Sequence, residues 1–320
     1  MSQGLESIFN LPVLFFIFGI FAKFVRSNLT IPPAIMTAVT LYLMMSIGTK
    51  GGLSLAHAPG IVEASKPIFI VILSSFLIPI YIYYFLRRFY GSPDAASIGA
   101  AYGSNSTMTF ITAAAFLDSI DVPFGGYMTV ALVVMETPAI VYSIFLHNRS
   151  KVGRTWHAVK EALVDGTQLL LIGSMVIGFV SSYLTNDKKL LTGFISGDIF
   201  TGMMGFFLLN MGLRVGEKLR DNLKELVGWG LGLFALLAPW VNGALGFALS
   251  YYLGLNVGDA FLTTLLCASA SYIVAPAIIP YAIPEANVER FLTMSIGITF
   301  PLNIMLGIPV WWEFCRSTLS

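Results

Sequence analysis

Apolar residues fill most of the chain in long runs that short polar segments separate. A helix needs about 20 apolar residues to cross a membrane. By this criterion the sequence predicts an all-α membrane protein with ten transmembrane helices. They centre on Leu11–Phe24, Ile31–Gly48, Pro67–Leu86, Ala95–Leu117, Val122–Leu146, Gly166–Leu184, Leu190–Leu213, Leu226–Leu253, Ala260–Ile283 and Phe291–Phe314.

A polar break interrupts the fourth of these runs. Residues Gly103 to Met108, with the sequence Gly-Ser-Asn-Ser-Thr-Met, lie inside the apolar run Ala95–Leu117. A helix that is interrupted at membrane depth frees backbone N–H and C=O groups, which only protein or a bound solute can satisfy there. We therefore expect a binding site at this break.

The same pattern recurs further along the chain. A shift of 164 residues aligns Ser104–Thr107 with Ala268–Ser271, and it also aligns Ile47–Gly52 with Met211–Gly216. The chain therefore consists of two copies of one unit, each with an interrupted helix, which are helices 4 and 9. Matched broken helices in two repeats are typical of the substrate site of a secondary transporter.

Composition and charge set the class and the orientation. Hydrophobic residues make up 56% of the chain and charged residues 11%, whereas a soluble domain has about 25% charged residues. The formal net charge of +1 argues against nucleic acid as a partner. With the N-terminus outside, the inside loops hold 13 of the 18 basic residues, which favours both termini outside the cytoplasm.

The number of spans fixes the relation between the two copies. Five spans per copy is an odd number, so the second copy is inverted relative to the first. The expected organisation is a first five-helix repeat at residues 1–147, a cytoplasmic linker at 148–160 and a second five-helix repeat at 161–320.

The two breaks favour an anionic guest. The second half of helix 4 begins near Asn105–Thr107, and a helix N-terminus carries unpaired N–H groups and about half a positive charge. Two such ends suit a small monovalent anion. The alternative is that small polar residues only join neighbouring helices there. The expected substrate-binding residues are Ser104, Asn105, Ser106, Thr107, Ser269, Ser271 and Tyr272.

Glu136 is the one carboxylate that is predicted to lie deep in a span. A carboxylate there costs about 2.5 to 3.5 kcal/mol on insertion scales, so it needs a partner. The expected roles are cation ligand or proton carrier, and a structural hydrogen-bonded partner is the alternative. Thr299 occupies the equivalent place in the second copy. The candidate sodium ligands are Glu136, Thr137 and Thr299.

Helix ends give three further predictions. Gly48 and Gly212 are expected to end their helices in left-handed turns. Pro276 is expected to end the first half of helix 9, because Pro does not continue a helix. Three carboxylates near span ends are expected to be solvated: Asp165, Asp198 and Asp259.

An enzyme is the least favoured class. The spans contain no Ser/His pair, no His-x-x-x-His spacing and no second deep carboxylate for acid–base chemistry. Cys267 and Cys315 lie in apolar spans, so the sequence predicts neither a disulfide framework nor a metal centre. Sodium as a coupling ion is the only cofactor that we expect.

Four segments resemble the sodium-dependent bicarbonate transporter family in order and spacing. They are Asn105–Met108, Glu136–Ala139, Ser269–Tyr272 and the tail from Ile283 to Pro309. The resemblance implies bicarbonate between the two broken helices, beside sodium. It also implies a gate domain of spans 1, 2, 6 and 7, a core domain of spans 3–5 and 8–10, an elevator-like movement and a homotrimer in the cell inner membrane.

The chain departs from the bicarbonate carriers of that family in two places. Tyr272 stands where those carriers have an Asp, and the central inside loop is shorter. The first departure therefore gives less support to bicarbonate as the substrate and to a second sodium ion, and the second gives less support to a regulatory partner protein.

The predicted function is secondary active transport, by sodium-coupled symport of bicarbonate or a similar small monovalent anion. One alternative is a proton-coupled carrier of a small organic acid, in which Glu136 titrates. Another is a passive anion channel, which would not accumulate its substrate. Uptake that follows a pH gradient and ignores sodium would select the proton-coupled carrier.

Overall fold

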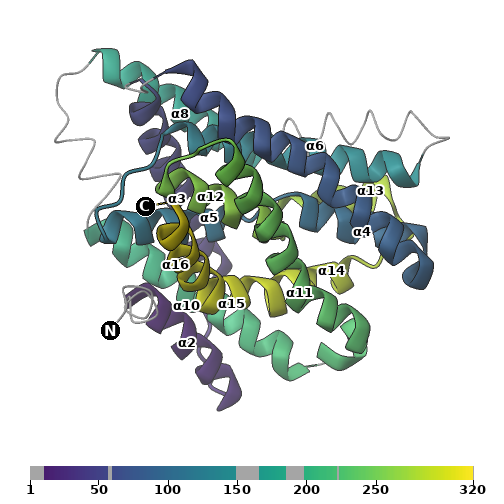
Figure 1. The fold of residues 1–320 in the computed structure, drawn as a ribbon. Coiled ribbons are helices and arrows are strands. Elements are labelled where there is room, and N and C mark those ends of the chain that lie inside the picture. Colours follow the sequence, from purple (N-terminus) through teal and green to yellow (C-terminus); the bar gives the residue numbers. More distant parts are fainter. Residues whose placement is uncertain (1–10, 57–59, 149–165, 185–197, 222, 320) are drawn as a thin grey trace.

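The computed structural model describes residues 11–56, 60–148, 166–184, 198–221 and 223–319, so the predicted linker at 148–160 lies almost entirely outside the described residues. Every regular element in the described ranges is helical (Figure 1). The elements are α2 (Leu11–Phe24), α3 (Pro33–Leu55), α4 (Ile61–Gly103), α5 (Thr107–Ser119), α6 (Tyr127–His147), α8 (Gly166–Leu184), α10 (Asp198–Asp221), α11 (Leu223–Tyr252), α12 (Val257–Ala268), α13 (Val274–Ala282), α14 (Val288–Met294), η1 (Ser295–Thr299), α15 (Phe300–Leu302), η2 (Asn303–Gly307) and α16 (Ile308–Leu319).

Within the described ranges, five helical stretches are long and apolar enough to cross a membrane. Many large apolar side chains on them are exposed, among them Phe85 and Leu237. An apolar exterior of this extent is expected of a surface that faces lipid. The stretches are Val62–Ser119, Tyr127–His147, Asp198–Arg220, Gly228–Tyr252 and Val288–Leu319.

The first of these stretches contains a kink and a break. Gly91 has a φ of +79°, a left-handed conformation that glycine adopts without a Cβ penalty, and it divides α4 into two helices. The second of them ends at Gly103, and the chain becomes helical again only at Thr107. Residues 61 to 119 thus contain one unbroken helix followed by two half-helices.

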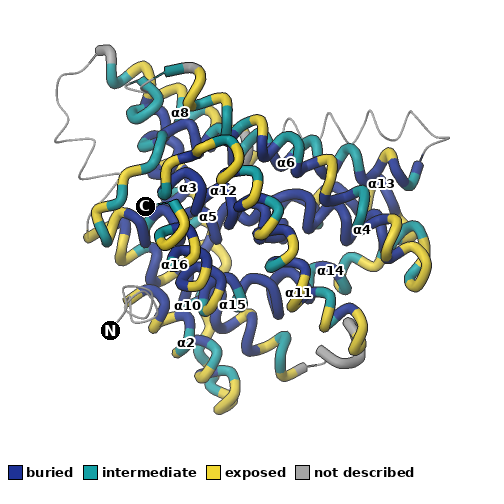
Figure 2. The backbone as a smooth tube through the Cα atoms, in the orientation of Figure 1, coloured by how far each residue is buried: buried dark blue, intermediate teal, exposed yellow. Residues whose placement is uncertain are grey.

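The helices pack in pairs, two of which join the first half of the chain to the second. α2 packs along α10 and α3 along α8, while α4 packs along α6 and α11 along α12. α5 and α12 contact each other in the middle of the molecule (Figure 1). Both are buried along almost their whole length (Figure 2). The most enclosed helices are therefore those that adjoin the predicted breaks.

The prediction that Gly48 and Gly212 end their helices is wrong. Both lie inside helices, Gly48 in α3 and Gly212 in α10. A Cβ at Gly212 would lie 2.1 Å from the carbonyl oxygen of Phe16, and a Cβ at Gly48 would lie 2.8 Å from that of Leu171. These glycines instead allow the backbones of α10 and α2, and of α3 and α8, to approach closely.

Gly212→Ala is therefore expected to destabilise the α2–α10 pair. The added methyl group would overlap the Phe16 carbonyl, and overpacking of this kind costs about 1–3 kcal/mol. The measurement is the thermal unfolding midpoint of the purified protein in detergent. Gly202→Ala, in the same helix, is the matched control, because a Cβ there meets no atom within 4 Å. Equal midpoints for the two variants would contradict the packing role of Gly212.

Candidate functional site

The first break has a defined local structure. The Ser106 hydroxyl accepts a hydrogen bond from the Thr109 amide at 3.2 Å, and the Ser106 carbonyl accepts one from the Phe110 amide at 3.1 Å. Ser106 is therefore the N-cap of α5, a position that serine favours. In the part of the chain that the structure describes, the amides of Thr107 and Met108 have no acceptor.

The second break follows the same plan. α12 ends at Ala268 and α13 begins at Val274, so residues 269 to 273 are not helical. The Ser271 hydroxyl accepts a hydrogen bond from the Ala275 amide at 3.2 Å. The prediction for Pro276 is wrong, because it lies in the first turn of α13 instead of ending the first half-helix. Pro is tolerated there because it needs no intrahelical acceptor in the first turn.

The two breaks contact each other directly. The Ser106 amide donates to the Ser269 hydroxyl at 2.8 Å, and the Ser271 amide donates to the Ala101 carbonyl at 2.8 Å. The segments are separated by more than 160 residues in sequence but form one centre. The predicted substrate-binding residues are all buried in it: Ser104, Asn105, Ser106, Thr107, Ser269, Ser271 and Tyr272.

The carbonyl ends of the half-helices are already occupied by protein donors. The Ala268 carbonyl accepts from the Asn303 side-chain amide at 2.9 Å, and the Tyr102 carbonyl accepts from the Asn242 side-chain amide at 3.4 Å. The Leu266 carbonyl accepts from the Ser269 hydroxyl at 3.0 Å. The C-terminal ends thus offer little to a solute, whereas the N-terminal ends of α5 and α13 point donors at the centre.

Several buried polar atoms at the centre lack a hydrogen-bond partner among the described residues. They include the Ser104 hydroxyl oxygen and the side-chain carbonyl oxygen of Asn105. An unsatisfied buried polar atom costs about 1–3 kcal/mol. No Lys or Arg occurs between Gly91 and Ser119 or between Val257 and Ile283. The break segments themselves therefore contribute positive potential only through backbone amides and helix dipoles, and Arg214 of α10 adds an electrostatic effect on Tyr272 from outside them.

Glu136 lies on the face of α6 that contacts the first break. The Asn105 side-chain amide donates to the Leu132 carbonyl at 2.8 Å, one turn before Glu136. A Cβ at Gly103 would lie 3.4 Å from the Ala139 Cβ, one turn after it. Residues 132, 136 and 139 share one helix face, and Glu136 is buried with 3% of its surface exposed. Residue 136 thus lies on the part of α6 that adjoins the first break.

The other two candidate sodium ligands differ in their surroundings. The Thr299 hydroxyl donates to the Ala235 carbonyl at 3.0 Å and accepts from the Tyr102 hydroxyl at 2.7 Å. One lone pair of Thr299 remains for an ion. Thr137 is half-buried and, as the neighbour of Glu136 in a helix, points away from the face that carries it.

Sequence reasoning did not single out three residues that shape the centre. The side-chain amides of Asn303 and Asn242 donate hydrogen bonds to carbonyls at the ends of the half-helices. The Tyr102 hydroxyl links the end of the first half-helix to Thr299. Asn242 also accepts a hydrogen bond from Tyr81. The signal that could have found the two asparagines is an amide side chain deep in an apolar span, which is costly without a partner.

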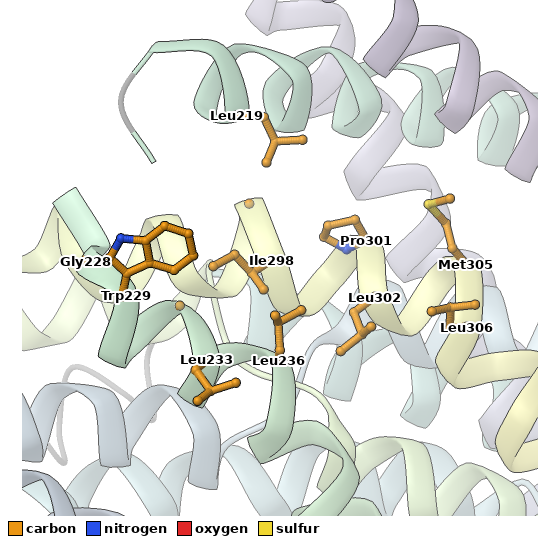
Figure 3. Close-up of a pocket in the computed structure, with 12 residues that line it drawn as sticks. Leu219, Gly228, Trp229, Leu233, Leu236, Ile298, Pro301, Leu302, Met305 and Leu306 are labelled. Atoms are coloured by element: carbon orange, nitrogen blue, oxygen red, sulfur yellow. The ribbon is translucent and has the colours of Figure 1, made fainter. Parts of the chain in front are cut away.

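A cavity of about 570 Å³ is lined by none of the residues of the two breaks (Figure 3). It is bounded by Leu219 at the end of α10, Trp229 and Leu233 near the start of α11, and Pro301 in α15. The labelled side chains around it in Figure 3 are apolar, apart from the indole nitrogen of Trp229. An anion needs several hydrogen-bond donors, so this cavity does not suit an anion.

Long apolar helices around a buried polar centre between two broken helices define an integral membrane transport protein. The chain belongs to the Na+-dependent bicarbonate transporter superfamily, whose family model matches residues 12–316, nearly the whole chain. The predicted family is therefore confirmed, and the protein is a transporter and not an enzyme. The family implies a small anion as substrate. A comparison with curated proteins found no match.

Proposed function

We propose that the protein carries bicarbonate, or a similar small monovalent anion, together with sodium. The observation that carries this proposal is the meeting of the N-terminal ends of α5 and α13 in one buried centre, to which neither break segment contributes a Lys or Arg. Each helix N-terminus supplies about half a positive charge. Two ends therefore balance a single negative charge, and their amides and hydroxyls suit the oxygens of a planar oxyanion.

Two arguments support sodium as the partner ion: the positions of two oxygen-bearing side chains, and the charge that the anion carries across the membrane. Glu136 and Thr299 come from equivalent places in the two copies, and each lies in a helix that contacts the first half-helix of the first break. Carboxylate, hydroxyl and carbonyl oxygens are the ligands of hard cations. Moving one negative charge inward against 100 mV costs about 2.3 kcal/mol, and one sodium ion removes this cost.

The proposed architecture is ten spans in two inverted repeats with an elevator-like movement. Two cross-copy helix pairs, α2 with α10 and α3 with α8, support a gate domain of spans 1, 2, 6 and 7. Spans 3–5 and 8–10 then form the core domain that carries the site. A homotrimer in the cell inner membrane, with both termini outside the cytoplasm, completes the proposal.

The test is uptake of labelled bicarbonate into proteoliposomes, with the sodium and pH gradients varied separately. The proposal predicts accumulation that depends on the sodium gradient. Accumulation that follows the pH gradient alone would select the proton-coupled carrier of a small organic acid, which the burial of Glu136 would also permit. Equilibration without accumulation would indicate a channel.

The elevator proposal also predicts a role for one ion pair. Lys50 of α3 pairs with Asp118 of α5 and lies 5.2 Å from the ring centre of Phe124. If α3 belongs to the gate and α5 to the core, this pair stabilises one position of the core. Both side chains are partly exposed, so the pair is worth about 1 kcal/mol or less, a change of up to about fivefold in the conformational equilibrium.

We therefore expect Asp118→Asn to change the maximal uptake rate by up to about fivefold with little change in sodium affinity. The charge swap Lys50→Asp with Asp118→Lys should restore much of the original rate. Initial rates at saturating substrate measure both. If the rate change of the charge swap equals the combined rate changes of its two single variants, the two side chains do not interact during transport.

A further inference from the structure

Asp259 is buried and was not expected to be. It lies in the first turn of α12 with 2% of its surface exposed, so the prediction that it is solvated is wrong. Its carboxylate accepts hydrogen bonds from the Gly125 amide at 2.7 Å, the Tyr127 hydroxyl at 2.5 Å and the Asn256 side-chain amide at 2.6 Å. We call Asp259, Gly125, Tyr127 and Asn256 the Asp259 cluster.

Asp94 has a matching environment. It lies in the first turn after the kink at Gly91, and its carboxylate accepts from the Asn287 amide at 2.8 Å and pairs with the Arg290 guanidinium. Asn287 caps α14, in whose first turn Arg290 lies. We call Asp94, Asn287 and Arg290 the Asp94 cluster.

The two clusters are equivalent under the internal repeat. Asp259 follows Asp94 by 165 residues, and Arg290 follows Tyr127 by 163, close to the shift of 164 that aligns the two breaks. Each carboxylate belongs to one copy, and its backbone amide donor and Tyr or Arg donor belong to the other. The same cross-copy contact therefore occurs twice.

The two carboxylates are separated from the breaks by the same number of residues. Asp94 and Asp259 each stand nine residues before the last residue of their half-helix, Gly103 and Ala268. Nine helical residues span about 13 Å. Each carboxylate thus fixes the far end of a half-helix whose near end opens into a break.

The partner helices show the same spacing. Tyr127 stands nine residues before Glu136, and Arg290 stands nine residues before Thr299. In the second case the near ends are joined as well, since the Tyr102 hydroxyl donates to Thr299 at 2.7 Å. The clusters therefore fix the register between each half-helix and the helix that carries a proposed sodium ligand.

We propose that Asp94 and Asp259 are positioning residues of the transport site, which hold the two breaks and the sodium ligands in register from opposite ends of the centre. This inference rests on the proposed function for its transport readout. Neither carboxylate touches the substrate. Each acts through the half-helix that it holds against the opposite copy.

The test uses Asp259→Asn and Arg290→Gln in the full chain, reconstituted at equal amounts of folded protein. Hydrogen bonds to a charged group are strong, and we expect the KM values for bicarbonate and sodium to rise about tenfold or more. The maximal rate should change by less than about twofold, because the proposed binding groups themselves remain. Tyr127→Phe, which removes one donor and keeps the carboxylate, should shift KM in the same direction by a smaller factor.

Hydrogen–deuterium exchange supplies a readout that does not depend on transport. In Asp259→Asn, peptides that contain residues 104–106 and 269–273 should exchange faster, while peptides of α2 and α10 should not change. Glu289→Gln is the matched control, because Glu289 adjoins Arg290 but forms a largely exposed ion pair with Lys218 at 2.8 Å. It should leave KM and exchange unaltered.

The outcomes separate the two proposals. Unchanged KM values in Asp259→Asn and Tyr127→Phe, or faster exchange along the whole chain, would overturn the positioning role. Absence of sodium-dependent uptake in the unmodified protein would overturn the proposed function instead. In that case faster exchange confined to the two breaks would still support the clusters as determinants of the centre, and unaltered exchange would refute them.

Discussion

Glu136→Gln is expected to abolish sodium-stimulated uptake and to leave the fold intact. Glu136 is buried on the face of α6 that contacts the first break, between the contact points Leu132 and Ala139. The amide keeps the size of the side chain but removes the negative charge that a cation needs. Initial uptake rates with and without a sodium gradient measure the effect. We expect the ratio of the two rates to fall to about one.

The control for this variant is Glu313→Gln, at a carboxylate that pairs with Arg316 near the end of α16. This substitution makes the same chemical change outside the proposed site and should leave sodium stimulation unaltered. Full sodium-stimulated uptake by Glu136→Gln would remove Glu136 from the mechanism. Loss of folded protein in Glu136→Gln, seen by size-exclusion chromatography, would show a structural role instead.

Thr107→Val combined with Ser271→Ala is expected to weaken substrate binding strongly. Each substitution removes a hydroxyl from the buried centre, and a hydrogen bond to a charged group contributes about 1.5–3 kcal/mol. We expect each single variant to raise the KM for bicarbonate about tenfold and the double variant to raise it about a hundredfold. Concentration-dependent uptake at saturating sodium measures this.

The conservative pair Thr107→Ser and Ser271→Thr retains both hydroxyls and serves as the control. Ser271 also accepts the hydrogen bond of the Ala275 amide, so Ser271→Ala should lower the thermal unfolding midpoint as well. Thr107→Val should not, since Thr107 caps no helix. If both single variants bind bicarbonate like the unmodified protein, the anion does not lie between the breaks.

The breaks could be predicted because they violate a local rule. Hydroxyl and amide side chains within an apolar run are conspicuous in one sequence, and the shift of 164 residues showed that Ser104–Thr107 has a counterpart at Ala268–Ser271. The structure places both segments at helix interruptions and in contact. A local polar pattern together with its repeat at a fixed shift was sufficient for this part of the site.

Apart from Pro276, whose place in the first turn of α13 is a local matter, the wrong predictions concern residues whose surroundings come from the other copy. Gly212 looked like a helix end, but its role is set by Phe16, almost 200 residues earlier. Asp259 looked solvated because it stands near a span end, but Gly125 and Tyr127 cover it. A glycine at a helix end and one at a helix contact look alike in the sequence, and so do a solvated and a buried carboxylate. Only the packing of distant segments decides which of the two occurs.

Equilibrium binding of labelled bicarbonate to the purified protein, with and without sodium, tests the central claim most directly. The account predicts saturable binding that requires sodium in the unmodified protein. It also predicts that binding is lost in the Thr107→Val, Ser271→Ala double variant and retained in Gly202→Ala. Undiminished binding by the double variant would contradict the claim that the anion lies between the two broken helices.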